Sequence, residues 1–293
     1  MNPYVTKIDE SEGQALKALL EQQGFELGKP PYTQFQGKKK GLSVTLYTSG
    51  KLVVQGKEME EFILYQLEPN VLKTVGYNYD DQTARIGVDE SGKGDFFGPL
   101  CVAAFFASGE GVSQLRTLGV KDCKSLSDSK IETLAAKLQK YPHEVVVLRP
   151  EKYNELYAKF RNLNQLLAWG HATVIHALSD KTGCQNVILD QFADESVVLT
   201  ALKKKGLSLD VLQKHRAEED LVVAAASILA RAAFLKELKR LSEWCGVTLP
   251  KGASQETLKA GQIFLNKWGK EKFIYVAKCH FKTLAKINGE SES

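Results

Sequence analysis

The sequence predicts an α/β protein in which helices flank a mixed β-sheet, preceded by a small α+β module. Apolar runs of strand length occur at residues 84–88, 100–106, 143–148 and 186–189, with helix-length stretches between and after them. Residues 1–80 carry a separate pattern of helix, hairpin and helix. We therefore expect two domains, residues 1–80 and residues 81–293.

The composition is that of an ordinary globular protein, with 43% hydrophobic and 25% charged residues. The longest nearly apolar run, Leu221–Ala230, is much shorter than the roughly 20 residues of a membrane-spanning helix. Residues 1–12 lack the basic start and apolar middle of a signal peptide. We expect a cytoplasmic protein that has no membrane partner.

The cysteines and histidines limit the metals that the protein can bind. Five cysteines are scattered without a C-x-x-C pair, and five histidines form no H-E-x-x-H or H-x-H pattern. This spacing argues against a zinc ribbon and a disulfide framework, and it fits a reducing compartment. Any metal ion must be held mainly by oxygen ligands, which leaves magnesium, manganese and calcium open.

Basic residues gather toward the C-terminal end. Residues 1–80 carry 9 Lys+Arg against 10 Asp+Glu, residues 81–293 carry 30 against 25, and residues 228–293 alone carry 12 against 6. This bias is compatible with a phosphate-rich partner, although an ordinary solvated surface can show it too.

The first module is expected to begin with a helix at residues 13–23, followed by turn-rich stretches at 28–31 and 37–41. Alternating apolar residues at 42–46 and 52–54, around the Ser49-Gly50 turn, predict a β-hairpin. A second helix should run from residue 57 to 67 and end before Pro69. Residues 70–82 then read as a linker.

The second module begins with the strand at 84–88 and a glycine-rich loop. The strand at 100–106 is apolar throughout, which is typical of a central strand buried on both faces. Helices are expected from Ser127, at 153–160 and 162–181, and at 221–244, 257–268 and 282–288. The alanine-rich start of the 221–244 helix should pack closely on the sheet and bring its N-terminus to the strand ends.

The glycine-rich loop, GVDESGKGD at 87–95, nearly matches a phosphate-binding P-loop. A P-loop needs Ser or Thr where this chain has Gly94, and two carboxylates in its cradle would repel phosphate. A nucleoside triphosphatase is therefore the weaker interpretation of this loop. The stronger one uses Asp89 and Glu90, adjacent carboxylates at a strand end, which repel each other unless cations bind between them.

A second strand-end acid supports this interpretation. In VILDQF at 187–192, an apolar run again ends in a carboxylate, Asp190. Together the acids can hold two magnesium ions about 4 Å apart, as in phosphodiester hydrolysis. Either Asp194 or Glu218 can supply a fourth acid, and Glu219 and Asp220 are expected to be solvated alternatives.

Several motifs in order resemble the type 2 ribonuclease H family. They are GVDESGKGDFFGPL at 87–100, DCKSLSD at 122–128, NLNQLLAWGH at 162–171, ILDQF at 188–192, AAASILAR at 224–231 and KCHF at 278–281. The Ser-Gly-Lys-Gly form of the loop resembles the bacterial HIII branch. YTSGKLVVQGK at 47–57 is similar to the N-terminal domain of that branch, which resembles the TATA-box-binding protein.

The resemblance implies a ribonuclease H-like fold and a metal-dependent endoribonuclease that cuts the RNA strand of RNA–DNA hybrids with Mg²⁺ or Mn²⁺. It places metal ligands at Asp89, Glu90 and Asp190. Position in the sequence makes Asp194 a candidate for the fourth catalytic acid, with Glu218 as its rival. Cys123 departs from the family, which usually has Ser in an Asp-Ser-Lys motif. The role of that position is therefore open.

Further residues are candidates for substrate binding. Ser91, Gly92, Lys93 and Gly94 are placed to meet 2′-hydroxyls and phosphates, because the wide minor groove of a hybrid exposes them. Lys121 and Lys124 can hold a phosphate or can simply be solvated.

We expect two histidines to have structural roles and three aromatic residues to lie at the surface. His171 and His280 are expected to pack in the structure, and Tyr32, Phe35 and Tyr47 to be exposed aromatics of the first domain.

The expected function is endonucleolytic hydrolysis of the RNA strand by a monomer, leaving 5′-phosphate and 3′-hydroxyl ends. The alternative is a protein that binds hybrids without cutting them, which would not need the clustered acids.

Overall fold

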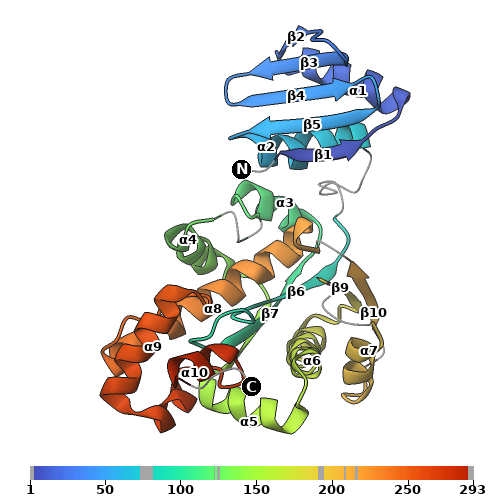
Figure 1. Ribbon diagram of the computed structural model, residues 1–293. Helices are drawn as coiled ribbons and strands as arrows, with labels where there is room; N and C mark the ends of the chain where they lie inside the picture. Colours follow the sequence, from blue (N-terminus) through green and yellow to red (C-terminus); the bar gives the residue numbers. More distant parts are fainter. Residues whose placement is uncertain are drawn as a thin grey trace. The chain divides into compact units, whose positions relative to one another are not determined.

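The computed structural model describes residues 3–72, 82–121, 123, 126–190, 195–207, 209–214 and 217–289. The chain divides into two compact units, Met1–Tyr79 and Asp80–Ser293, and each is described by itself (Figure 1). In the described residues, no helix combines the length and the apolar character needed to cross a bilayer.

The first unit is a five-stranded antiparallel sheet with helices on one face. The strand order is β1-β5-β4-β3-β2. The strands are β1 (Tyr4–Lys7), β2 (Glu26–Gly28), β3 (Thr33–Lys39), β4 (Leu42–Tyr47) and β5 (Lys51–Gly56). The helices are α1 (Glu10–Gln22), α2 (Met59–Phe62) and the π-helical η1 (Ile63–Leu72).

Helix α1 shows why this face of the sheet is covered. Its N-cap, Asp9, accepts a hydrogen bond from the Glu12 amide, and the Glu12 side chain accepts one from the Asp9 amide, so two end amides are satisfied. Leu16 and Leu20 are fully buried against the inner residues of the hairpin, such as Val44. The predicted hairpin is confirmed as β4 and β5.

Two predictions for this unit are wrong in detail. The helix does not end before Pro69 but continues to Leu72 as a π-helix. The Asn70 side chain donates to the Gln66 carbonyl at 2.8 Å within this segment. Residues 37–39 belong to β3, so the turn shrinks to Lys40-Gly41. The predicted linker is helical as far as Leu72, and residues 73–81 lie outside the described part.

The second unit is a five-stranded mixed sheet with order β10-β9-β6-β7-β8. The strands are β6 (Arg85–Ser91), β7 (Leu100–Ala107), β8 (His143–Leu148), β9 (Asn186–Asp190) and β10 (Asp210–Lys214). Strands β6, β7 and β8 are antiparallel neighbours, whereas β9 and β10 run parallel to β6. The predicted mixed sheet flanked by helices is therefore confirmed.

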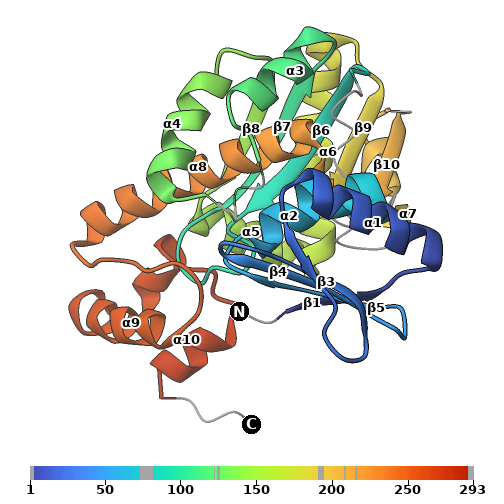
Figure 2. The same ribbon diagram turned by 90° about the horizontal axis from the view of Figure 1, so that it is seen from above.

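Two groups of helices cover the two faces of this sheet (Figures 1 and 2). One group is α3 (Glu110–Thr117), α4 (Asp128–Leu138) and α8 (Leu221–Cys245). The other is α5 (Pro150–Phe160), α6 (Leu163–Thr182) and α7 (Glu195–Lys203). The C-terminal part adds α9 (Gln255–Trp268), η4 (Lys270–Tyr275) and α10 (Lys282–Ile287), and the short η3 (Ala217–Glu219) precedes α8.

Alternation along β6 assigns its side chains to the two faces. Ile86 and Val88 are fully buried in the core that includes Leu166 and Leu167 of α6. Gly87 points the other way, where a Cβ atom would lie only 2.3 Å from the Val223 amide nitrogen of α8. The alanine-rich helix therefore packs closely on the sheet, as predicted.

Candidate active site

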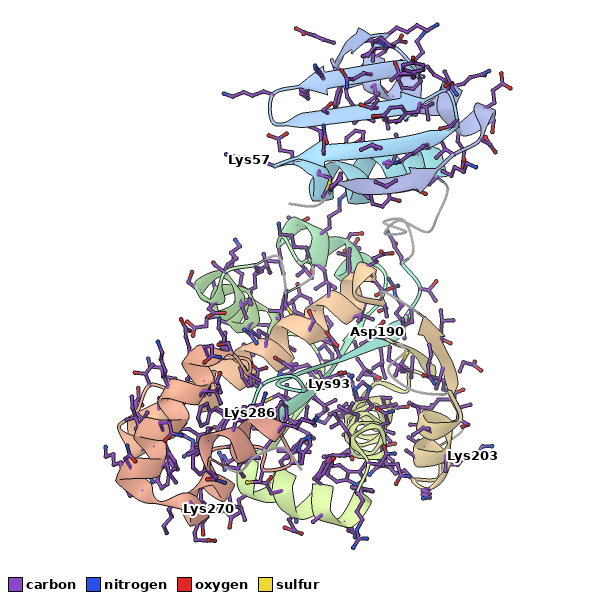
Figure 3. All side chains as sticks on the ribbon, in the orientation of Figure 1. Lys57, Lys93, Asp190, Lys203, Lys270 and Lys286 are labelled. Atoms are coloured by element: carbon purple, nitrogen blue, oxygen red, sulfur yellow. The ribbon has the colours of Figure 1, made fainter. Side chains whose placement is uncertain are left out.

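The predicted acids lie at the ends of two neighbouring parallel strands. Val88 of β6 pairs with Leu189 of β9, and Asp89 and Asp190 each follow directly. Lys93 follows the end of β6, and Asp190 ends β9 (Figure 3). Because parallel neighbours end at the same edge of a sheet, the fold brings these two carboxyl-bearing positions together.

Two side chains contact the Glu90 carboxylate, one at each oxygen atom. Its Oε2 atom lies 3.0 Å from Nε2 of His171, and its Oε1 atom lies 3.4 Å from Nζ of Lys93. Burial by itself raises the pKa of the Glu90 carboxyl, but the hydrogen bond and charge of His171, with those of Lys93, outweigh it and lower that pKa. Glu90 is thus stabilised as a carboxylate although only 11% of its side chain is exposed.

His171 is buried as expected, but its contact with Glu90 is not predicted from the sequence. The side chain is 1% exposed and reaches the site from α6. One sequence signal could have found it. His171 lies inside an otherwise apolar helical stretch of the NLNQLLAWGH motif, where a buried imidazole needs a polar partner.

Asp89 and Asp190 share a face, and Glu90 points to the opposite one. The sequence pattern predicts a strand that ends at Val88, but β6 continues to Ser91, so adjacent side chains alternate. Asp190 Oδ1 accepts a hydrogen bond of 3.3 Å from the Ala217 amide of η3, and Glu90 turns toward α6. Among the residues that the structure describes, no three His, Cys, Asp or Glu side chains are grouped so as to hold a metal ion.

The two candidates for the fourth acid fall outside what is described. Asp194 is not among the described residues, and Glu218 lies in η3 with its side chain not described. The backbone of η3 nevertheless lies beside Asp190, because Ala217 hydrogen-bonds to it.

The expectation that Asp220 and Glu219 are solvated is wrong. Asp220 is the N-cap of α8: its Oδ1 atom accepts from the Val222 amide at 2.8 Å, and its Oδ2 atom accepts from Arg85 Nε at 2.8 Å. Oε1 of Glu219 is also buried. The ion pair also shows that α8 begins beside the first residues of β6. The predicted approach of its N-terminus to the strand ends is therefore wrong, and η3 reaches Asp190 instead.

The loop after β6 is tightly built at one end and open at the other. Gly92 has φ +94°, a conformation that favours glycine, and a Cβ atom there would lie 2.2 Å from the Pro99 carbonyl oxygen. A Cβ atom at Gly94 would have no described atom within 4 Å. Ser91 is the last residue of β6, opposite Cys101. A polymer backbone can therefore approach the loop at Gly94.

Other predicted residues have mixed outcomes. Lys121 is partly exposed, and Lys124 lies outside the described residues. His280 packs as expected, stacked on the Tyr157 ring at 4.0 Å between centroids. Cys123 is partly buried.

Two of the three aromatics expected at the surface of the first unit are exposed. Tyr32 is 86% exposed and Tyr47 is 37% exposed. The expectation for Phe35 is wrong, because this ring is buried in the first unit's core against the helices.

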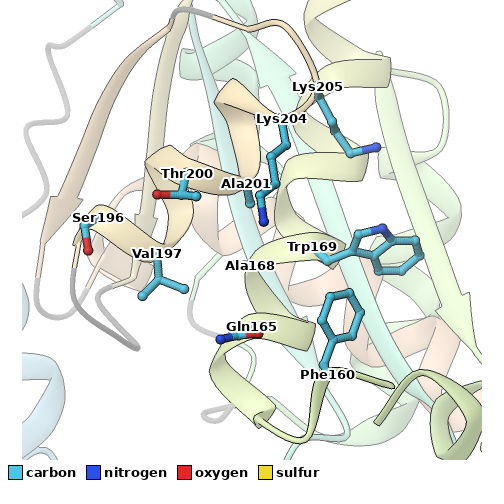
Figure 4. A pocket seen from close by; sticks show the side chains of 10 residues that line it. All are labelled: Phe160, Gln165, Ala168, Trp169, Ser196, Val197, Thr200, Ala201, Lys204 and Lys205. Carbon is cyan, nitrogen blue, oxygen red and sulfur yellow. The ribbon is translucent and has the colours of Figure 1, made fainter. Parts of the chain in front are cut away.

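A cavity of about 460 Å³ lies between α6 and α7, apart from the predicted acids (Figure 4). Its lining consists of Phe160, Gln165, Ala168, Trp169, Ser196, Val197, Thr200, Ala201, Lys204 and Lys205. None of the predicted catalytic residues belongs to this set. Cavity size therefore does not locate the chemistry of this protein.

The donor chemistry of the strand ends fits a hard divalent cation. Asp89, Glu90 and Asp190 offer only carboxylate oxygens, the ligands that Mg²⁺ and Mn²⁺ prefer. Glu90, kept ionised by its neighbours, suits such an ion, since a metal ligand must be deprotonated.

Comparison with known proteins defines the class first. A family model described as "Ribonuclease HII" matches residues 86–284, the part of the chain that carries the mixed sheet and the strand-end acids. The second unit is thus that of a type 2 ribonuclease H. Residues 3–68 match a model described as a domain of unknown function, DUF3378.

Curated relatives identify the branch of this class to which the chain belongs. A protein of Protochlamydia amoebophila named "Ribonuclease HIII" is 53% identical over 98% of this chain and 97% of its own length. One of Chlamydia abortus with the same name is 50% identical over 97% of both. The chain belongs to the ribonuclease HIII family, and the resemblance noted in the sequence is confirmed.

Solved structures also cover nearly the whole chain. A structure titled "Crystal structure of Bst-RNase HIII in complex with Mn2+" matches with a TM-score of 0.70 at 28% identity and covers 98% of each chain. The RNase H3 of Aquifex aeolicus matches with a TM-score of 0.57 at 29% identity, over 94% of this chain and 98% of that one. Both units of the chain therefore occur together in these relatives.

Proposed function

We propose that this protein is an endonuclease that hydrolyses the RNA strand of RNA–DNA hybrids with Mg²⁺ or Mn²⁺, leaving 5′-phosphate and 3′-hydroxyl ends. The observation that carries the proposal is the juxtaposition of Asp89 and Asp190 at the ends of paired parallel strands. Glu90, the next residue along β6, is held ionised on the opposite face of the strand. The relatives named ribonuclease HIII, one of them solved with Mn²⁺, support it.

The carboxylates of Asp89, Glu90 and Asp190 would hold the metal ions, with Asp194 as the proposed fourth acid and Glu218 as its rival. The bound ions supply an activated water and stabilise the charge of the leaving 3′-oxygen. His171 orients the Glu90 carboxylate from the buried side, at 3.0 Å. The amide of Ala217 does the same for Asp190 from η3.

The loop Ser91–Gly94 would bind the RNA strand. Gly94 leaves room for the sugar–phosphate backbone. The Lys93 ammonium, 39% exposed and 3.4 Å from Glu90 Oε1, would contact a phosphate. The 2′-hydroxyl is the group by which a protein distinguishes RNA from DNA at a given position. Lys121 and Lys124 are proposed as further phosphate contacts.

The first unit, the proposed domain of residues 1–80, would bind the hybrid as well. The sheet face away from α1 carries polar and basic side chains on neighbouring strands, among them Lys7 opposite Lys51. Tyr47 lies at the exposed end of β4. Lysines for phosphate and an aromatic ring for a sugar or base are suited to a nucleic-acid surface.

We further propose that the protein acts as a monomer in the cytoplasm, with residues 81–293 as the catalytic domain. Size-exclusion chromatography with light scattering tests the first point. A stable dimer at micromolar concentration would refute it.

Asp190→Asn tests the catalytic assignment. The amide keeps the shape and one oxygen ligand but removes the charge that offsets the cations, so cleavage of a hybrid should fall about 10³-fold, or roughly 4 kcal/mol in barrier. Hybrid binding without metal should persist or tighten, because a negative charge facing phosphate is gone. The measurements are single-turnover cleavage and equilibrium binding, on hybrid, duplex DNA and single-ribonucleotide substrates.

Asp210→Asn is the matched control, because it makes the same change at the exposed start of β10. Near-normal cleavage by Asp190→Asn would contradict the assignment. Asp194→Asn and Glu218→Gln, measured in the same assay, identify the fourth acid by which of them loses cleavage.

A further inference from the structure

Lys278 is a fully buried lysine in the segment between η4 and α10. Its Nζ atom donates hydrogen bonds to the carbonyl oxygens of Asp95 at 2.8 Å and of Gly98 at 2.9 Å. The ammonium also lies 5.5 Å from the centroid of the Tyr153 ring. The two carbonyls and the ring face thus surround the buried ammonium.

Both carbonyls belong to the second half of the loop that begins with Ser91–Gly94. Main-chain contacts bind this half to the same segment: Gly98 N donates to Val276 O at 2.9 Å, and Lys278 N donates to Phe96 O at 2.9 Å. Phe97 and Ala277 form an isolated antiparallel bridge. Residues 95–98 are therefore held from one side by residues 276–278.

The segment that carries Lys278 is itself fixed to α5. The Asn154 side chain donates to the Ala277 carbonyl at 2.9 Å and accepts from the Cys279 amide at 2.9 Å. The loop, the Lys278 segment and α5 form a chain of hydrogen bonds that joins the open loop to a helix of the core. Such a connection limits the positions that the loop can adopt.

A lysine is an unfavourable residue to bury, so its presence here calls for a reason. Burial lowers the pKa of Lys278 to about 7, against the opposing charges of Asp95 and Cys101. Hydrogen bonds offset the cost of burying the lysine, because its one ammonium donates to two carbonyls at different positions of the loop. An apolar side chain would leave both carbonyls without this donor, and a buried carbonyl without a hydrogen-bond donor is unfavourable.

We propose that Lys278 is a positioning residue for hybrid binding: it fixes Asp95–Gly98 and thereby sets the position in which Ser91–Gly94 meets the RNA strand. This inference rests on the proposed function. Lys278 is fully buried and its ammonium is bound to the loop carbonyls, so it acts through the loop and not on the phosphates.

Lys278→Met tests the inference, because it keeps most of the length of the side chain and removes both hydrogen bonds. The KM for a hybrid substrate should rise about tenfold, whereas kcat at saturating substrate should stay within about threefold. The dependence of binding on salt should keep its slope, since no phosphate contact is lost. Hydrogen exchange at the Gly98 amide should become faster.

Lys259→Met is the matched control, because it makes the same change at an exposed position of α9 and should leave KM unaltered. An unchanged KM in Lys278→Met, with or without a lower melting temperature, would overturn the inference, as would a loss confined to kcat. If Lys278→Met does not fold, Asn154→Ala is measured in its place, because it loosens the same segment from α5. A raised KM in Asn154→Ala would then support the inference, and an unchanged KM would overturn it. A wild-type protein that cleaves no hybrid refutes the proposed function, whereas an active wild type with unaltered variants refutes only the role of Lys278.

Discussion

At the scale of single residues, the surroundings of Glu90 decide its charge. A carboxylate that is 11% exposed would tend to take up a proton, but His171 and Lys93 favour its ionised form. The two partners differ in exposure, since His171 is 1% exposed and Lys93 is 39% exposed. His171 is thus a fixed part of the fold, whereas the Lys93 side chain has room to turn toward a bound phosphate.

His171→Phe should weaken the metal site without removing a proposed ligand. The ring stays in its buried place, but Glu90 loses the hydrogen bond that orients its carboxylate. Loss of such a partner typically costs about 10- to 100-fold in metal affinity or activity. A Mg²⁺ titration of the cleavage rate should show half-saturation at a correspondingly higher concentration.

The control is His176→Phe on the same helix, where the side chain is 40% exposed and pairs with Asp180. An unaltered Mg²⁺ requirement in His171→Phe would show that the imidazole serves packing alone.

Single residues also show how far sequence reasoning reaches. Asp89, Glu90 and Asp190 are predictable because they follow apolar strands. The burial of Asp220 is not, because its partner Arg85 is 135 positions away in the chain. The burial of Phe35 escapes prediction for a different reason: a mostly polar strand such as TQFQGKK does not show which of its faces the helices cover.

At the scale of elements, the contact between β6 and α8 is made by backbone atoms on both sides. Gly87 allows the backbone of α8 to lie directly on the strand, since a Cβ atom there would be 2.3 Å from the Val223 nitrogen and 2.4 Å from the Val222 carbonyl carbon. Backbone atoms of a long helix cannot move aside as a flexible side chain can. This close approach places η3, just before α8, against Asp190.

Gly87→Ala should therefore destabilise the protein, by about 3 kcal/mol, at the upper end of the usual cost of overpacking. Denaturant unfolding followed by circular dichroism measures this change. Gly111→Ala in α3 is the control, since its nearest new contact is an ordinary 3.9 Å and alanine favours a helix by about 1 kcal/mol. Equal stability of the two variants would contradict the packing argument.

Elements are predictable where they are long or apolar. The helices α4, α5, α6, α8 and α9 and the strands β7, β8 and β9 agree with their sequence patterns. Strands β1 and β2 have only 4 and 3 residues, too few for periodicity to show. Strand β10, DVLQK, has as many residues as β9 but a shorter apolar run. The full length of β6 is hidden in the sequence because Asp89 and Glu90 are poor strand formers, yet pairing with β7 extends it to Ser91.

At the scale of the whole molecule, each unit has its own core. The first unit buries Leu16, Leu20 and Val44 among others, and the second buries a separate set around β6, β7 and α6. A unit with its own buried core is able to fold without its neighbour.

Deleting residues 1–80 should therefore leave a folded, metal-dependent nuclease that binds hybrids less tightly. Circular dichroism checks the fold, and equilibrium binding to a hybrid with and without the deletion checks the affinity. Equal affinity would refute the role proposed for the first unit. An unfolded product would refute the independence of the second.

The position of β9 has a consequence for the synthesis of the protein. Strand β6 pairs with β7 soon after both leave the ribosome, but its parallel partner β9 begins at Asn186, and α8, which covers Gly87, begins at Leu221. At about 5–20 residues per second, the chain needs several seconds to add the roughly 80 residues between β7 and β9. Throughout that time one edge of β6 has no partner strand, and Asp89 lacks Asp190 beside it. Because Asp190 is a proposed catalytic acid, we expect the nascent chain to be inactive as a nuclease until roughly two thirds of it has been made.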